Sequence, residues 1–109
     1  MTRNELDRIF TNKVKEYFSK GFTINTKTMG GTQGELARVD VRKDDTLIRI
    51  YMETDGSDYG ELINIIIGKA PQTNRNIWNS QLEIIEKNIF LYKTKNNYIP
   101  VEESDILNN

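Results

Sequence analysis

The stretch LARVDVRKDDTLIRIYME, residues 36–53, decides the fold because apolar and polar side chains alternate on both sides of a short polar turn. A period of two residues is typical of a β-strand with one buried face. The turn is Lys43-Asp44-Asp45, so the sequence predicts two antiparallel strands over residues 36–42 and 47–53. The residues expected to face the core are Ala37, Val39, Val41, Ile48, Ile50 and Met52.

Before this hairpin lies a glycine-rich stretch, TMGGTQG, residues 28–34. It lacks the GxxxxGK[ST] spacing of a phosphate-binding loop, and an alternating strand follows it where such a loop needs a helix. The tetrad at residues 31–34 matches the GXXG loop of KH domains, but that loop joins two helices. The sequence therefore predicts a turn or bulge between a strand over residues 22–28 and the strand over 36–42.

The N-terminal residues have the pattern of an amphipathic helix over residues 3–20. Thr2 and Glu5 have the spacing of a capping box, and Gly21 stands where a left-handed residue ends a helix, with Phe22 able to pack back on the last turn. The apolar positions recur at spacings of three and four: Leu6, Ile9, Phe10, Val14, Tyr17 and Phe18. One apolar stripe facing a sheet is expected.

The second half of the chain predicts a further strand over residues 61–69, whose run Ile65-Ile66-Ile67 favours burial on both faces or beneath the helix. Residues 77–87 have both helical and strand periodicity, and we interpret them as a short helix, with Trp78 in or beside the core. A hairpin between 90–93 and 98–101 is expected next, and residues 102–109 form a short helix or a frayed end.

These elements together predict one α+β domain over residues 1–109. Its N-terminal helix packs on a mainly antiparallel sheet of four to five strands, and a C-terminal helix or hairpin closes it. No apolar run is long enough to span a bilayer, and the first residues lack the apolar region of a signal peptide. A cytoplasmic protein that does not associate with membranes is expected.

The composition excludes most small-enzyme mechanisms because the chain has no cysteine and no histidine. Disulfides, Cys or His zinc sites, thiol nucleophiles and Ser-His-Asp machinery all require these residues. We therefore expect a protein that is not an enzyme and that uses no metal or cofactor.

The candidate binding residues lie on the two central strands, at the positions that alternate with the core residues and therefore point to the opposite face of the sheet. They are Arg38, Arg42, Arg49 and Tyr51, which predicts an outward basic face with one aromatic ring. Such a face can bind phosphates and stack a base, or contact an acidic protein. Asp40 and Glu53 share the face, so an ordinary solvated surface of paired charges is the alternative.

An acidic loop, residues 53–61, offers a second candidate contact through Asp55, Asp58 and Glu61. It lacks the spacing and the closing bidentate glutamate of an EF-hand, so a solvated connection or a contact with a basic partner is favoured over a metal site. Residues 1–50 carry ten Lys and Arg against seven Asp and Glu, and residues 51–109 carry five against nine. The net charges of +3 and −4 make the chain dipolar and suit charge-steered binding.

Two parts of the chain resemble small uncharacterised proteins of plasmids, conjugative elements and phages of low-GC Gram-positive bacteria, as does its richness in Ile, Asn and Lys. They are FTINTKTMGGTQGELARVDV (22–41) continued through the strand around Ile48 to Tyr51, and WNSQLEIIEKNIF (78–90). Such elements also encode anti-CRISPR proteins, which inhibit type II CRISPR effectors. The resemblance implies a protein-binding inhibitor whose partner is the effector nuclease or its guide RNA complex.

In that hypothesis the acidic loop occupies part of a basic nucleic-acid channel, and Arg38, Arg42 and Arg49 contact acidic protein or guide RNA phosphates. The alternative is a nucleic-acid-binding accessory protein of plasmid or phage maintenance or transfer, which uses the arginines and Tyr51.

Overall fold

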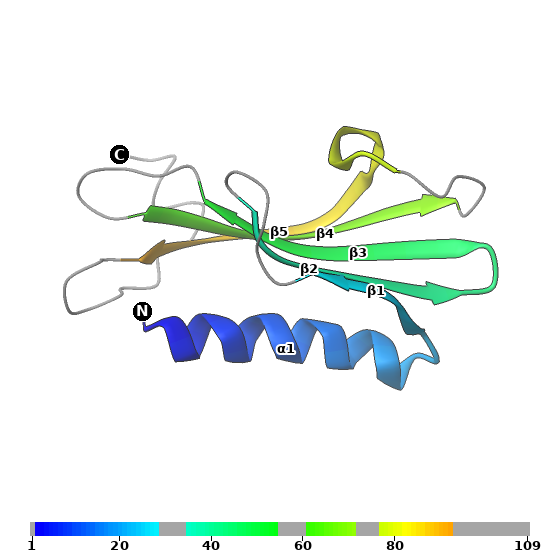
Figure 1. Cartoon of the computed structure of the whole chain (residues 1–109), viewed down its shortest axis with the longest axis horizontal. Helices are drawn as coiled ribbons and strands as arrows, with labels where there is room; N and C mark the ends of the chain where they lie inside the picture. The colour runs from blue at the N-terminus through cyan, green and yellow to red at the C-terminus, as the bar shows by residue number, and fades with distance from the viewer. Residues whose placement is uncertain (1, 29–34, 55–60, 72–76, 93–109) are drawn as a thin grey trace.

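A computed structural model describes residues 2–28, 35–54, 61–71 and 77–92. One helix precedes five strands that form a single antiparallel sheet in the order β1-β2-β3-β4-β5 (Figure 1). The elements are α1 (Arg3–Ser19), β1 (Thr23–Thr28), β2 (Glu35–Lys43), β3 (Thr46–Thr54), β4 (Glu61–Pro71), the 3₁₀ turn η1 (Asn79–Gln81) and β5 (Glu83–Tyr92). The predicted α+β class, with an N-terminal helix on an antiparallel sheet, is confirmed.

Both ends of α1 follow the predicted signals. The Thr2 hydroxyl accepts a hydrogen bond from the Glu5 amide at 3.1 Å, and the Glu5 carboxylate accepts one from the Thr2 amide at 3.0 Å. At the other end Gly21 has φ +93°, and the Phe22 ring meets Tyr17 edge-on with centroids 5.4 Å apart. The two cap hydrogen bonds satisfy backbone amides at the start of α1, and at its end the Phe22 amide donates to the carbonyl of Tyr17 at 3.0 Å.

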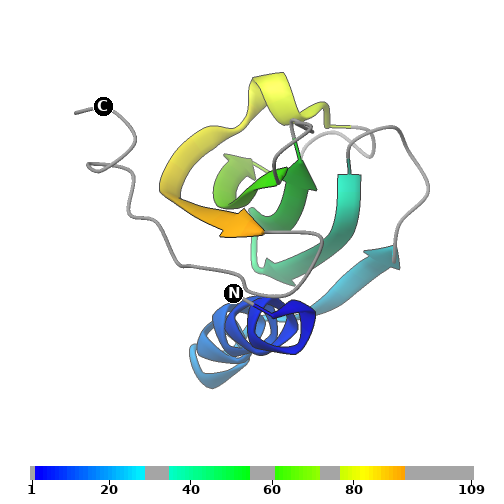
Figure 2. The same cartoon turned by 90° about the vertical axis from the view of Figure 1, so that its left-hand side faces the viewer.

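The helix covers one face of the sheet, and the apolar core lies between the two layers (Figure 2). Each strand contributes alternate residues, and the register places Val39, Ile50 and Ile67 side by side across β2, β3 and β4. All six residues predicted to face the core from the central strands are buried in it. The residues of α1 in this core are Leu6, Phe10 and Val14.

The opposite face has a second, smaller core beneath residues 77–82, which cross that side of the sheet (Figure 2). Its buried members are Tyr51, Ile66, Ala70 and Leu82, with Ile77 packed against them. Since Ile65 and Ile67 lie in the core under α1, the predicted burial of Ile65–Ile67 on both faces is confirmed.

Gly68 explains how residues 77–82 approach the sheet so closely. A Cβ atom built on Gly68 would lie 2.7 Å from Cβ of Leu82 and 2.8 Å from its Cδ1, which is closer than such atoms come in real structures. A side chain at position 68 would therefore push Leu82 away from β4.

The helix expected over residues 77–87 is wrong. Those residues form the short turn η1 and the beginning of β5, which pairs with β4 from Lys69↔Glu83 to Glu61↔Tyr92 and has an irregularity beside Ile84. Pairing with the edge of β4 satisfies the backbone of this segment and lets Phe90 pack on the main core. In the expected hairpin, residues 90–92 pair with β4, and 98–101 lie outside the described residues.

Candidate protein-binding surface

An ion pair lies at the centre of the face opposite α1. Arg49 of β3 stands directly across from Asp40 of β2, and its Nε and Nη2 donate to the two carboxylate oxygens at 2.9 and 3.1 Å. Arg49 is 4% exposed and Asp40 is 5% exposed. Burying either charge alone would be costly, and the bidentate geometry compensates both.

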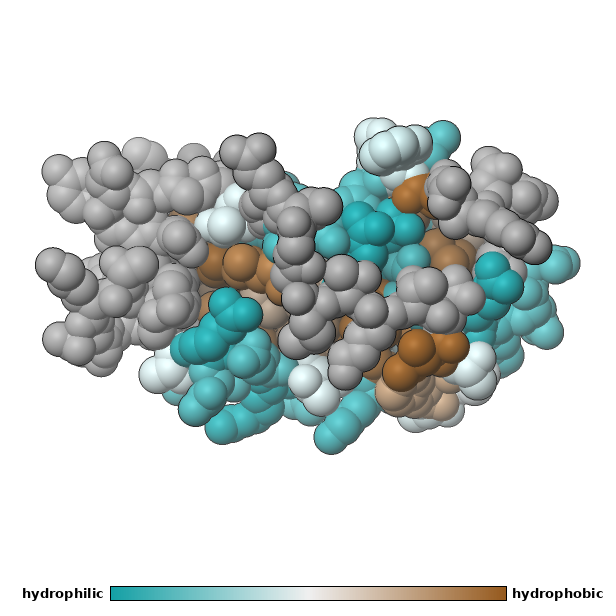
Figure 3. Space-filling model, viewed as in Figure 1, coloured by the Kyte–Doolittle hydropathy of each residue, from teal (hydrophilic) through white to brown (hydrophobic). Residues whose placement is uncertain are grey.

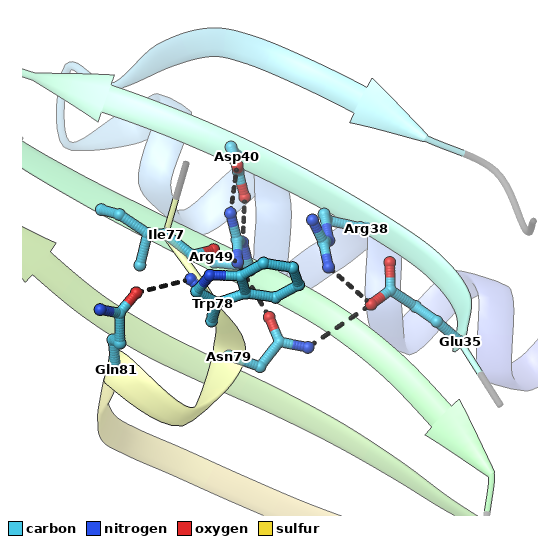
Figure 4. A network of polar contacts seen from close by, with 8 residues as sticks. All are labelled: Glu35, Arg38, Asp40, Arg49, Ile77, Trp78, Asn79 and Gln81. Atoms are coloured by element: carbon cyan, nitrogen blue, oxygen red, sulfur yellow. Dashed lines mark hydrogen bonds and ion pairs between the residues drawn. The ribbon is translucent and has the colours of Figure 1, made fainter. Parts of the chain in front are cut away.

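The remaining nitrogen of the guanidinium holds residues 77–82 against the sheet (Figure 4). Nη1 of Arg49 donates to the backbone carbonyl of Ile77 and, at 2.9 Å, to Oδ1 of Asn79. Asn79 Nδ2 lies 3.5 Å from a carboxylate oxygen of Glu35, which also accepts from Nη2 of Arg38 at 2.9 Å. Three segments, β2, β3 and residues 77–79, therefore meet around Arg49.

Trp78 stands between the two residues that Arg49 holds. Its amide donates to the side-chain oxygen of Gln81 at 2.9 Å, and its carbonyl accepts from the Gln81 amide at 2.9 Å. The side chain nevertheless remains 73% exposed. The expectation that Trp78 lies in or beside the core is wrong, because Leu82 is buried and Ile77 packs against that cluster in its place.

The four residues predicted to form a basic face do share one side of the sheet, but their predicted exposure is wrong for two of them. Arg49 and Tyr51 are buried beneath residues 77–82. Arg38 is half-buried and paired with Glu35. Arg42 is half-buried, and its Nε is buried without a hydrogen-bond partner among the described residues. The face is therefore a packed polar network with two arginines at its margin.

The acidic loop and the glycine-rich turn are placed only in part. Asp55 and Asp58 lie outside the described residues, and Glu61 is the first residue of β4, with its side chain outside the described part. Residues 29–34 are also outside it, while β1 and β2, which they connect, pair antiparallel as predicted.

The described residues contain no group of three or more acidic, cysteine or histidine side chains arranged to hold a metal ion. Burial, followed by the nearby Glu53 carboxylate, raises the pKa of the Tyr51 hydroxyl, so this group is protonated at neutral pH. None of the described helices is both long and apolar enough to span a membrane.

Sequence reasoning did not identify three residues that shape this surface: Gly68, Ile77 and Asn79. Gly68 interrupts an isoleucine-rich strand, which is a recognised sign of close approach by another segment. The roles of Ile77 and Asn79 depend on a contact with an arginine about thirty residues earlier, for which local periodicity carries no signal.

No protein family, curated protein or solved structure matches this chain.

Proposed function

We propose that this domain is a non-enzymatic protein-binding accessory of a mobile genetic element that inhibits a type II RNA-guided nuclease. The observation that carries protein binding is Trp78, which is 73% exposed although Arg49 holds the residue on each side of it, Ile77 by its carbonyl and Asn79 by its side chain. The inhibitor hypothesis comes from the resemblance to proteins of mobile elements, and Trp78 supplies a place where an inhibitor could contact its target.

A fixed, exposed tryptophan is suited to binding for two physical reasons. Tryptophan is enriched among the residues that dominate interface energies, and burying most of its side chain contributes on the order of 3–4 kcal/mol before entropic costs. The hydrogen bonds from Arg49 order the turn in the free protein, so less conformational entropy is lost on binding.

The charged residues have different roles in this proposal. Arg49 positions the turn that carries Trp78 and does not itself touch the partner. Arg38 and Arg42, at the margin of the network, contact acidic protein or guide RNA phosphates, while Asp55, Asp58 and Glu61 occupy part of a basic nucleic-acid channel.

The experiment measures plasmid interference by several divergent type II systems in cells that coexpress this protein. We expect interference to fall with the wild type and to be restored by Trp78→Ala, because the substitution removes the proposed anchor without touching the core. Ser80→Ala, in the same exposed turn, is the matched control and should inhibit like the wild type. Purified variants are compared for binding to the effector loaded with guide RNA.

Unchanged interference across all the effectors would overturn the inhibitor proposal. Full inhibition by Trp78→Ala would instead show that the contact lies elsewhere. The nucleic-acid alternative is favoured by the Nε of Arg42, which has no hydrogen-bond partner in the described part of the chain, and is weakened by the burial of Arg49 and Tyr51. It would replace the inhibitor proposal if the protein bound a labelled single strand with an affinity that falls steeply with salt and with Arg42→Glu.

A further inference from the structure

A cleft opens on the face of the sheet that α1 covers, between α1 and the edge formed by β1 and β2. Its volume is about 330 Å³, within the range of pockets that accept small molecules or large side chains. The lining is mainly apolar, with Phe10, Val14 and Phe18 from α1, and Ile24, Val39 and Met52 from three strands. Figure 3 shows apolar surface where the helix meets this edge of the sheet.

The cleft exists because α1 packs chiefly against β3, in the middle of the sheet, and leaves the β1 side less covered. At its mouth the side chains of Phe18 and Ile24 are 40% and 53% exposed. Burying them against a partner would therefore remove apolar surface from water without any rearrangement of the core.

Two positive charges lie on α1 in the row of side chains next to the lining of the cleft. Thr11 lines the cleft, and Arg8 and Lys15 stand three residues before it and four after it, which makes them its neighbours on the helix surface. Both are exposed, and neither forms an ion pair with any described residue. The one acidic side chain of the lining, Asp7, is paired with Arg3 at 3.2 Å.

We propose that this cleft binds an acidic peptide segment of a partner protein, which inserts a leucine or phenylalanine side chain and places carboxylates against Arg8 and Lys15. The apolar lining selects the inserted side chain, and the charged rim selects acidic flanks and disfavours basic ones. The cleft lies across the sheet from Trp78, so this site is independent of the proposed inhibition.

The test titrates the ¹⁵N-labelled full chain with the capped hexapeptide Glu-Glu-Leu-Phe-Glu-Glu and follows amide chemical shifts. We expect shifts concentrated over residues 10–18 of α1 and at Ile24 and Val39. A peptide with lysine in place of each glutamate, and one with Ser-Ser in place of Leu-Phe, should each bind at least about fivefold more weakly.

Two variants of the protein test the two parts of the site. Arg8→Glu combined with Lys15→Glu should weaken binding at least about fivefold, and Thr11→Trp should block the cleft from its rim. The matched control, Lys69→Glu with Lys87→Glu, makes the same charge change on exposed residues of β4 and β5 and should leave binding within about twofold. Far-UV circular dichroism and the melting temperature check that each variant folds.

Equal binding of the acidic and lysine peptides, or binding unchanged in both rim variants, would overturn the proposal. Decanoate binding in the cleft without peptide binding would also overturn it, in favour of a small amphiphilic ligand. Because the titration uses no nuclease, its failure leaves the interference result intact, and failure of the interference assay leaves this test intact.

Discussion

The two faces of the sheet are covered in different ways. On one face the 17-residue helix α1 spreads its contacts over a broad apolar core that includes Leu6, Phe10 and Val14. On the other face six residues, 77–82, are held by the hydrogen bonds of Arg49 and by the packing of Leu82 against Gly68. Apolar burial spread over a helix depends little on any one contact, whereas residues 77–82 depend mainly on these two.

The largest expected effect comes from Asp40→Ala. The substitution leaves Arg49 buried without its carboxylate partner, and breaking a buried pair in this way typically costs about 3–5 kcal/mol. Urea denaturation followed by circular dichroism measures the free energy of unfolding. We expect the double variant Asp40→Ala with Arg49→Met to recover part of the loss, since no uncompensated charge remains buried.

A loss of unfolding free energy below about 1 kcal/mol in Asp40→Ala would show that groups other than Asp40 compensate the buried charge of Arg49. The face opposite α1 would then depend less on this one ion pair than we infer. A double variant no more stable than Asp40→Ala would show that the hydrogen bonds of Arg49 to residues 77–82 outweigh the cost of its buried charge.

Gly68→Ala tests the second contact that holds residues 77–82, the packing of Leu82 against β4. The added methyl group would collide with Leu82, so we expect a loss of about 1–3 kcal/mol with the strands retained. Trp78 is the single tryptophan of the chain and reports on this segment. Its fluorescence anisotropy should fall in the folded variant as the turn loosens, while Lys69→Ala, at the adjacent exposed position, should leave it unchanged.

Unchanged Trp78 anisotropy in folded Gly68→Ala would show that the hydrogen bonds of Arg49 alone hold the turn. The contrast between the two faces of the sheet would then be larger, since one contact rather than two would secure residues 77–82.

The face under α1 could be predicted from the sequence because every signal for it is local. Alternation gives the strands, and spacings of three and four give the helix. Within the predicted turn Lys43-Asp44-Asp45, Lys43 pairs with Thr46, so Asp44 and Asp45 set the register of β2 and β3. Asp40 is four residues before Asp44 and Arg49 is four after Asp45, so their pairing follows from that turn. The turn therefore also sets the ion pair on the opposite face, although both residues were expected to be exposed.

The other face could not be predicted because its cover is specified by long-range contacts. The hydrogen bonds of Arg49 to Ile77 and Asn79 join residues 28 and 30 positions apart. Residues 78, 82, 85 and 89 happen to have helical spacing, yet pairing with β4 prevails over that local preference. Once residues 77–82 lie on the sheet, Arg49 and Tyr51 become interior residues, and the predicted binding face becomes the support for Trp78.

The smallest effect concerns a contact that joins α1 to the edge strand β5, the ion pair between Lys13 and Glu86. Burial alone would raise the pKa of the Glu86 carboxyl, but hydrogen bonds from Lys13 and Asn88 outweigh it and lower that pKa. The hydrogen bond with Glu86 in turn raises the pKa of Lys13. We expect Glu86→Gln to cost about 0.2–1 kcal/mol at neutral pH, because the pair is partly exposed.

The pH dependence of that small loss follows from the directions of the two shifts. A carboxyl whose pKa is lowered by folding contributes stability above its unfolded value near 4.5, and the contribution disappears as the pH falls through the folded value. Lys13 has the opposite sign, so its share is present below 10.5 and disappears as the pH rises through its raised value. Urea denaturation of wild type and Glu86→Gln at pH 7 and pH 3 should therefore show a difference that shrinks in acid. A difference as large at pH 3 as at pH 7 would mean that Glu86 stabilises the domain by packing rather than by its charge, and the contact between α1 and β5 would then resemble the rest of the apolar face.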